Sequence, residues 1–289
     1  MLTEAVSPQV DPFQDIIPMG NFQSPRAILV VGCGGTGAHV AGHLAHLVST
    51  LPLAIRLVFA DGDKVEQKNL ERQHFIRQDM GLNKAEVLAA RYSVAFGVEI
   101  GMVPSYLEDV AAVDKIAPDL VIGCVDNNAS RRILHAWFNA GNYNRGRFWI
   151  DAGNEEGSGQ VICGFDTPSY GSCHGMFCLP SVAEVYPDVL DEKGKFNSQL
   201  SCAELAVSPP QGMMANVTAA TLVLNFAQKI MRGQTLRAHG VVFSVDNSFR
   251  TMLNTPENLV KVSPTRRRAW DRFGLNRENW DTLMERGKR

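Results

Sequence analysis

The chain has 289 residues, of which 45% are hydrophobic and 20% charged, and its formal net charge at pH 7 is −2. A chain of this length can bury one large core, and α/β folds of this size often form a single domain. The near-neutral charge speaks against a general nucleic-acid or membrane binder. The acidic, proline-broken start does not resemble a signal peptide, and no apolar run approaches the roughly 20 residues that span a bilayer. We therefore expect a soluble cytoplasmic protein with neither nucleic-acid nor membrane partners.

The first predicted element is a strand, 27–31, that leads through a glycine-rich turn into a helix. The turn has the pattern G-x-G-G-x-G, formed by Gly32, Gly34, Gly35 and Gly37. The first glycine allows a tight turn, the middle pair let a phosphate-bearing ligand approach the backbone, and the last lets helix and strand pack closely. The helix N-terminus offers free N–H donors to an anion. The turn predicts a nucleotide site, and the alternative is a merely tight strand-to-helix connection.

A second strand is predicted at 55–61, and it ends on Asp61. An acidic residue at this position of a βαβ unit holds ribose hydroxyls in nucleotide-binding folds. The stretch that follows carries polar groups for which a hydride-transfer enzyme has no need: Asp63, Asn69, Arg72, Gln73 and Lys84. Fixed cations and amides suit a nucleoside triphosphate, because they offset the charge of phosphoryl oxygens. Alternatively, Asn69 and Gln73 brace the connection, and Arg72 and Lys84 lie on a solvated helix face.

Further along, DLVIGCVDNNASRR (119–132) predicts a buried strand that ends in C-x-D-N, then a helix with an arginine five residues after Asp126. Taken in order, G-x-G-G-x-G, D-x-D-x-V-x-x-x-N-L-x-R-Q, G-x-x-K and C-x-D-N resemble the ThiF/MoeB family, the adenylating enzymes related to ubiquitin-activating enzymes. The resemblance covers about 27–231. It implies a Rossmann-like, doubly wound α/β fold with a mostly parallel sheet and flanking helices.

The resemblance also implies roles for single residues. The four glycines would line an ATP site, Asp61 would bind ribose, and Asp126, beside Asn127, would help to hold Mg²⁺ and position the triphosphate. The groups implied around the phosphates are Asp63, Asn69, Arg72, Gln73 and Lys84, with Arg72 and Lys84 as the cations.

The implied activity is ATP- and Mg²⁺-dependent adenylation of the C-terminal carboxylate of a small ubiquitin-like β-grasp carrier protein, by a homodimer. A second hypothesis is a scaffold that binds such a partner without turning over ATP. A third is an NAD- or FAD-dependent oxidoreductase that uses the glycine turn.

The cysteines raise two separate questions. Cys173 and Cys178 are spaced C-x4-C where many relatives hold half of a structural zinc site. The second pair of those relatives is missing, so we expect ordinary thiols; a zinc site that recruits Cys163, Cys202 or His174 is the alternative. Cys202 matches a cysteine that accepts the activated carrier in part of the family, since a thiolate is a good acyl acceptor. The alternative for Cys202 is a small buried residue.

The chain departs from the family at its start. Relatives usually have an N-terminal R-Y-x-R-Q segment whose arginine reaches the ATP of the neighbouring subunit, but no arginine precedes Arg26 here. This departure and the missing zinc pair suggest a divergent branch, similar to the ThiF-type proteins of plasmid-borne PRTRC gene systems.

We expect an arm at 1–24, an adenylation domain at 25–260 that includes a mobile crossover loop at 186–201, and a basic, aromatic tail at 261–289. The arm is either packed or swapped, or else disordered. Within the domain, 148–150 should be a core strand and 215–231 a buried helix, and we expect Met213 and Met214 to pack.

Overall fold

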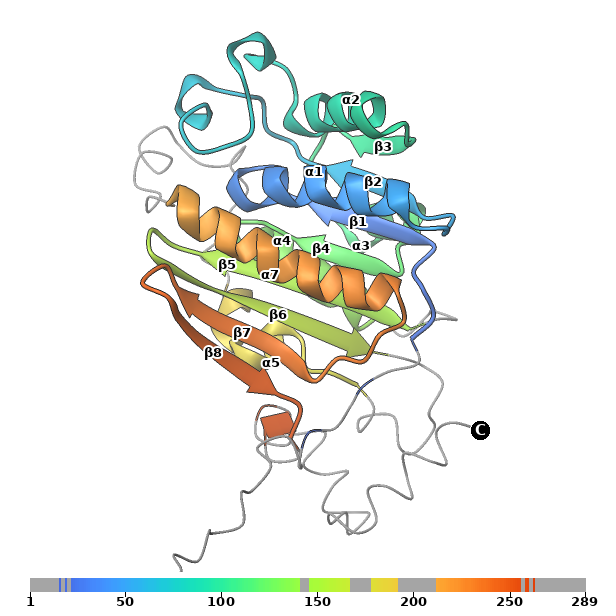
Figure 1. Ribbon diagram of the computed structural model, residues 1–289, viewed down its shortest axis with the longest axis vertical. Coiled ribbons are helices and arrows are strands. Elements are labelled where there is room, and N and C mark those ends of the chain that lie inside the picture. The colour runs from blue at the N-terminus through green and yellow to red at the C-terminus, as the bar shows by residue number, and fades with distance from the viewer. Residues whose placement is uncertain are drawn as a thin grey trace, which may run out of the picture.

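The computed structural model describes residues 16, 19, 22–140, 146–166, 178–191, 212–255, 258–259 and 262. Its centre is one eight-stranded sheet in the order β3-β2-β1-β4-β5-β6-β7-β8 (Figure 1). The strands from β3 to β5 in this order pair in parallel, and β6, β7 and β8 follow antiparallel. The bounds are β1 (Ala27–Val31), β2 (Arg56–Ala60), β3 (Ile100–Val103), β4 (Leu120–Gly123), β5 (Arg147–Asn154), β6 (Ser158–Asp166), β7 (Ala238–Ser244) and β8 (Ser248–Leu253).

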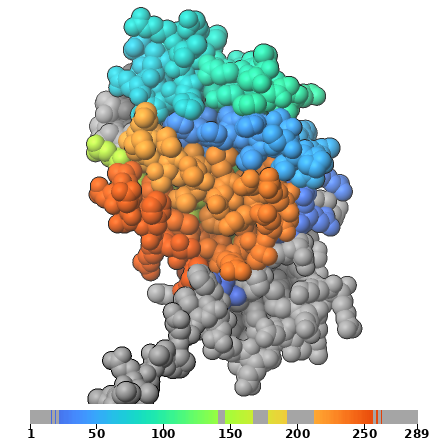
Figure 2. Space-filling view, viewed as in Figure 1, coloured from blue at the N-terminus to red at the C-terminus, as the bar shows by residue number. Residues whose placement is uncertain are grey.

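Helices cover both faces of the sheet. One face carries α1 (Gly35–Thr50), α2 (Lys84–Phe96) and α7 (Met213–Met231), and the other carries α3 (Val110–Ile116), α4 (Asn128–Phe138) and α5 (Val182–Val185). Figure 2 shows α1 in blue and α7 in orange, side by side over the first face. Short 3-10 helices are η1 (Gln67–Asn69), η2 (Arg77–Asp79) and η4 (Pro187–Leu190). This arrangement confirms the predicted Rossmann-like, doubly wound and mostly parallel fold.

Alternate side chains of the parallel strands enter two different cores. Ile28 and Val30 of β1 pack in the core under α1, α2 and α7, whereas Leu29 and Val31 pack in the core with α3 and α4. All four are buried, because a parallel sheet covered on both faces has no solvated side. The run 148–150 of β5 is likewise buried, as its apolar sequence predicts.

The order of the strands determines where a ligand site can lie. The chain runs outward from β1 to β2 and β3, then returns to place β4 on the other side of β1. Helices α1 and α2 cover one face of the sheet, and α3 and α4 cover the other. In open α/β sheets, ligands bind outside the carboxyl ends of the strands where the winding reverses. In this chain that point is the boundary between β1 and β4.

Of the crossover loop expected at 186–201, only residues 186–191 are described, so its mobility stays a prediction. These residues include the 3-10 helix η4, whose Val189 and Leu190 pack against the second core. Arg132 of α4 also donates a hydrogen bond to the Asp191 carbonyl at 2.6 Å. Met213 and Met214, expected to pack, are 53% and 57% exposed, because the buried face of α7 begins two residues further on.

The described residues near the N-terminus pack against the domain. Met19 forms an antiparallel bridge with Leu236, and the Phe22 ring contacts those of Phe148 and Phe165 at centroid distances of 4.9 and 5.0 Å. The rest of the expected arm, and residues 261 and 263–289 of the expected tail, lie outside the described ranges. Among the residues that the structure describes, no helix has the length and hydropathy of a membrane span.

Candidate functional site

Gly32 and Gly37 shape the turn between β1 and α1. Gly32 has a φ of +89°, and a Cβ there would lie 2.5 Å from the carbonyl oxygen of Cys124. A Cβ on Gly37 would overlap the carbonyl oxygen of Gly32. No side chain fits at either position, so these glycines are required by the protein's own turn and packing.

Gly34 has a different environment. A Cβ at this position would have Nε2 of Gln73 as its nearest neighbour, at an ordinary distance of 3.7 Å. The described protein therefore does not itself require glycine there. Gly34 is also the N-cap of α1, which has no side-chain cap and no acidic residue in its first turn. An open backbone at an uncapped helix N-terminus fits a phosphate-bearing ligand such as ATP.

Asp61 ties the carboxyl end of β2 to the glycine turn. Its Oδ2 accepts a hydrogen bond from the N–H of Cys33 at 2.6 Å, and its Oδ1 accepts one from the N–H of Asp63 at 2.8 Å. The residue is 9% exposed. Burial raises the pKa of Asp61 to about 6, although the charge of Lys84 opposes the shift. Asp61 therefore organises the turn, and its predicted contact with ribose stays a prediction.

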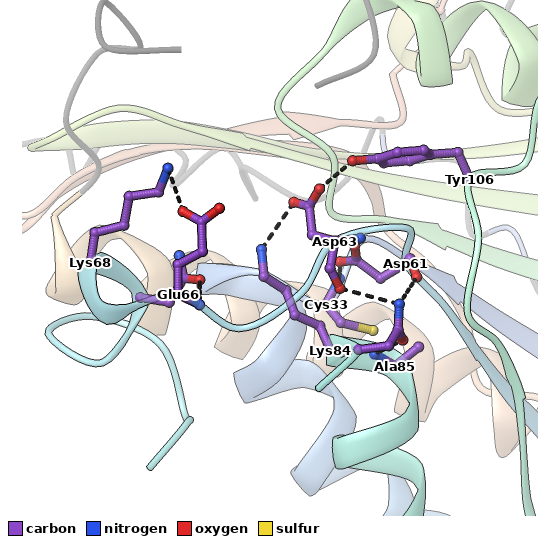
Figure 3. A network of polar contacts seen from close by, with 10 residues as sticks. Cys33, Asp61, Asp63, Glu66, Lys68, Lys84, Ala85 and Tyr106 are labelled. Atoms are coloured by element: carbon purple, nitrogen blue, oxygen red, sulfur yellow. Dashed lines mark hydrogen bonds and ion pairs between the residues drawn. The ribbon is translucent and has the colours of Figure 1, made fainter. Parts of the chain in front are cut away.

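Lys84 is the first residue of α2 and is only 5% exposed. Its Nζ lies 3.0 Å from Oδ2 of Asp63, and the other oxygen of this carboxylate accepts a hydrogen bond from the Tyr106 hydroxyl (Figure 3). Burial by itself lowers the pKa of Lys84, but the charges of Asp61, Asp63 and Asp126 outweigh it and raise this pKa above its ordinary value. The site therefore holds a fixed positive charge, which can offset negative charge on phosphoryl oxygens.

Asn83, which the sequence motifs did not single out, places Lys84. Its Oδ1 caps α2 by accepting hydrogen bonds from two N–H groups of the first helical turn. Its Nδ2 donates to the main-chain carbonyls of Asp61 and Asp63 at 2.8 and 3.2 Å. The cap thus fastens the start of α2 to the end of β2. The available signal was an asparagine directly before the helix, since asparagine is favoured at that position.

Gln73 and Asn69 are both buried, with different surroundings. Asn69 accepts a hydrogen bond from the N–H of Glu66 at 2.8 Å and so braces η1, which is the alternative that the sequence left open. The Gln73 amide lies beside Gly34, and its Oε1 has no hydrogen-bond partner among the described residues. A buried acceptor without a protein partner is available to a ligand. Arg72 is partly buried. For these residues, binding to phosphate stays a prediction.

Asp126 lies in the turn after β4. Its side chain is exposed and makes no hydrogen bond to another residue in the described ranges. The next residue, Asn127, caps α4 by accepting a hydrogen bond from the N–H of Ser130 at 2.8 Å. One free carboxylate fits Mg²⁺ bound together with phosphate oxygens. A cluster of three or more His, Cys, Asp or Glu side chains that could hold a metal does not occur in the described part of the chain.

A buried ion pair supports the turn that carries Asp126. Nε of Arg131 lies 3.1 and 3.2 Å from the two carboxylate oxygens of Asp151 in β5. The same guanidinium donates to the carbonyl of Val125 at 2.9 Å. Arg131, the arginine of the sequence motif, therefore holds the backbone beside Asp126.

A group of hydrogen-bonded side chains, which the sequence did not reveal, joins α1, β5 and α7. The Thr36 hydroxyl lies 2.9 Å from Oδ1 of Asn154 and 3.2 Å from Oδ1 of Asn216, and Nδ2 of Asn154 donates to the same Asn216 oxygen at 2.9 Å. Within the described ranges, Nδ2 of Asn216 has no hydrogen-bond partner. Single Thr and Asn residues 62 to 180 positions apart carry no local signal for such a group.

The described cysteines have the surroundings of structural cysteines, since their thiols are buried or partly buried. Burial raises the pKa values of Cys33, Cys124 and Cys163, so these thiols stay protonated. The thiol of Cys178 donates to Oδ1 of Asp166 at 3.1 Å. Two of the cysteines to which the sequence assigns roles, Cys173 and Cys202, lie outside the described residues.

The chain is similar to several known proteins. It is 28% identical over 214 residues to ubiquitin-like modifier-activating enzyme 5 of Drosophila melanogaster. This alignment covers 69% of this chain and 48% of the relative. Among solved structures, E. coli MccB with ATP aligns with a TM-score of 0.50 and 18% identity, over 80% of this chain and 63% of that chain. MccB in complex with N-formylated MccA aligns with a TM-score of 0.53 and 19% identity, over 80% and 65%.

These relatives set limits on what similarity alone shows. The chain spans about half the length of the curated relatives that it matches and under two thirds of these MccB chains. At such low identity, the solved structures support the fold alone. The profile of the ThiF family, however, matches residues 23–259, which is most of the chain. The chain therefore belongs to the ThiF family.

Proposed function

We propose that this chain is an ATP- and Mg²⁺-dependent adenylyltransferase that activates the C-terminal carboxylate of a small ubiquitin-like β-grasp protein. One observation carries the proposal: the glycine turn, the Asp63–Lys84 pair and Asp126 converge at the carboxyl ends of β1, β2 and β4. The name of the ubiquitin-like modifier-activating relative and the ATP and MccA bound to MccB support this class of reaction.

The residues divide the work of binding ATP. The backbone at Gly34 and the N-terminus of α1 receive phosphate oxygens, and Asp61 faces the ribose. Lys84 and Arg72 supply positive charge, while Asn69 and Gln73 supply amide groups around the phosphates. Asn127 orients the turn in which the Asp126 carboxylate would hold Mg²⁺. When bound there, Mg²⁺ would neutralise further charge on the triphosphate.

The chemical step needs positioning and charge stabilisation. A carboxylate oxygen of the carrier forms a bond to the α-phosphorus of ATP, and the bond from that phosphorus to the bridging oxygen breaks. Pyrophosphate leaves with the electron pair, and an acyl-adenylate remains. The attacking carboxylate is already ionised at neutral pH, so no side chain has to remove a proton from it. Fixed cations that match the charge of the transition state supply the catalysis.

We propose that the acyl group is then transferred to Cys202. The alternative acceptors are a conjugating partner and a sulfur donor. Replacing Cys202 by Ala should leave adenylate formation intact and remove a thiol-sensitive covalent adduct with the carrier. An unchanged adduct would rule out Cys202 as the acceptor. We further propose a cytoplasmic homodimer with two ATP sites.

ATP–pyrophosphate exchange tests the central claim. The purified protein is incubated with a β-grasp protein encoded beside its gene, with and without Mg²⁺. Exchange that needs both the carrier and Mg²⁺ is the expected result. A sample that binds ATP and the carrier but shows no exchange would instead support the hypothesis of a non-catalytic scaffold. Binding of NAD or FAD in place of ATP would favour the oxidoreductase.

A further inference from the structure

Tyr106 lies beyond the carboxyl end of β3 and reaches the polar group at the end of β2 (Figure 3). It belongs to none of the sequence motifs described above. Its hydroxyl donates a hydrogen bond to Oδ1 of Asp63, while Oδ2 of the same carboxylate lies 3.0 Å from Nζ of Lys84. The two oxygens of Asp63 are therefore held by two different partners.

The Tyr106 ring is fixed by a second contact. A Cβ on Gly62 would lie 2.6 to 2.7 Å from three ring carbons of Tyr106, which is closer than side-chain atoms approach each other. The ring therefore lies flat against the backbone between Asp61 and Asp63. This contact and the hydrogen bond to Asp63 together restrain the position of the hydroxyl.

The charges around Tyr106 keep it a hydrogen-bond donor. Burial, the hydrogen bond to Asp63 and the nearby carboxylates of Asp61 and Asp126 all raise the pKa of Tyr106. The hydroxyl is therefore protonated at neutral pH and donates to Asp63 throughout. A carboxylate held at one oxygen cannot rotate freely, so its other oxygen offers Lys84 one fixed direction.

We propose that Tyr106 is a positioning residue for the nucleotide: by holding Asp63, it fixes the Lys84 ammonium where the polyphosphate of ATP binds. This inference rests on the nucleotide site proposed above, but it depends neither on the adenylation step nor on the identity of the carrier. It has a specific consequence, which is that the Tyr106 hydroxyl acts on ATP only through Asp63.

A double-mutant cycle on ATP affinity tests this consequence. Calorimetry compares wild type, Tyr106→Phe, Asp63→Ala and the double variant. Alanine at residue 63 keeps the main-chain bonds to Asp61, Asn83 and Lys84. Tyr106→Phe should weaken ATP binding about tenfold, which corresponds to about 1.4 kcal/mol. The double variant should bind ATP as Asp63→Ala does, because the carboxylate through which the hydroxyl is proposed to act is then absent.

Several outcomes would overturn the inference. These are wild-type affinity in Tyr106→Phe, losses that multiply in the double variant, and a wild-type protein that does not bind ATP. Affinity that is kept in Tyr106→Phe but lost in Tyr106→Leu would assign Tyr106 to packing on Gly62 alone. Tyr92→Phe is the matched control, since it removes a hydroxyl from the later part of α2 and should keep wild-type affinity.

The two proposals can fail separately. Thermal unfolding followed by circular dichroism should show that Tyr106→Phe stays folded at the temperature of the binding assay. If wild type and variants reproduce the cycle but wild type shows no pyrophosphate exchange, the adenylation proposal fails and the role of Tyr106 stands. If wild type shows exchange but Tyr106 and Asp63 show no coupling, the adenylation proposal stands and the proposed role of Tyr106 fails.

Discussion

The side chain of Asn216, in the first turn of α7, lies directly against Gly35 in the first turn of α1. A Cβ on residue 35 would lie 2.6 Å from Cγ and 2.7 Å from Oδ1 of Asn216, which is itself fully buried. Since Oδ1 of Asn216 also binds Thr36 and Asn154, one amide fastens α7 to the glycine turn and to the end of β5. The geometry of the candidate ATP site therefore depends on a helix that comes far later in the chain.

Gly35→Ala should destabilise the fold by displacing this amide. Added atoms in a packed interior cost about 1–3 kcal/mol when neighbours must shift. Urea denaturation of wild type, Gly35→Ala, Asn216→Ala and the double variant measures the coupling. The double variant should lose less free energy of unfolding than the two single losses added together, because removing the amide makes room for the new methyl group. Simple additivity would contradict this contact.

Gly34→Ala should have the opposite profile. The new methyl group would meet only the end of Gln73, at 3.7 Å, so the free energy of unfolding should stay near that of wild type. The same methyl group would stand where a phosphate is proposed to approach, so ATP binding should weaken by at least about tenfold, or about 1.4 kcal/mol. Calorimetry and urea denaturation measure the two effects. Unchanged ATP affinity would remove Gly34 from the binding site.

Asp126→Ala should abolish Mg²⁺-dependent exchange without unfolding the protein. The carboxylate is exposed and makes no hydrogen bond within the described ranges, so its removal leaves no buried group unpaired. Asp126→Ala should therefore lose pyrophosphate exchange and keep the thermal unfolding temperature of wild type. Asp246→Ala, an exposed carboxylate in the turn between β7 and β8, is the matched control and should exchange normally. Normal exchange by Asp126→Ala would refute the proposed metal contact.

His39 should make stability depend on pH in the acid range. It is buried in α1, its ring centroid lies 3.9 Å from that of His74, and its Nε2 has no hydrogen-bond partner in the described part of the protein. Burial and the charges of His74 and His43 lower the pKa of His39 from 6.5 to about 4. The unfolded chain therefore binds a proton first as the pH falls. The stability from neutral His39 is present above pH 6.5 and is lost as the pH falls towards 4.

Urea denaturation between pH 7 and 4 checks this sign. The free energy of unfolding of wild type should fall more steeply with decreasing pH than that of His39→Leu. His46→Leu, which removes an exposed histidine from the same helix, is measured beside them as the control. Equal slopes for wild type and His39→Leu would show that His39 is not the titrating group.

Local sequence determined the elements that carry the site. The apolar run 27–31, the glycine pattern and the apolar strand ending on Asp61 each predict their own conformation, because periodicity and glycine spacing act over neighbouring residues. Once these strands are parallel, the residues that follow them must share one edge of the sheet. The sequence was therefore sufficient to predict that the glycine turn, Asp61 and Asp126 lie close together.

The tertiary structure alone decided which further side chains meet at that edge. Tyr106 and Asn216 belong to no motif, and they reach Asp63 and Gly35 because β3 and α7 pack beside β2 and α1. Packing also placed η4 against the second core, and it left Met213 exposed although the sequence predicts that this residue packs. The physical reason is that contacts between distant segments depend on strand register and helix packing. Residue spacing along the chain does not encode these.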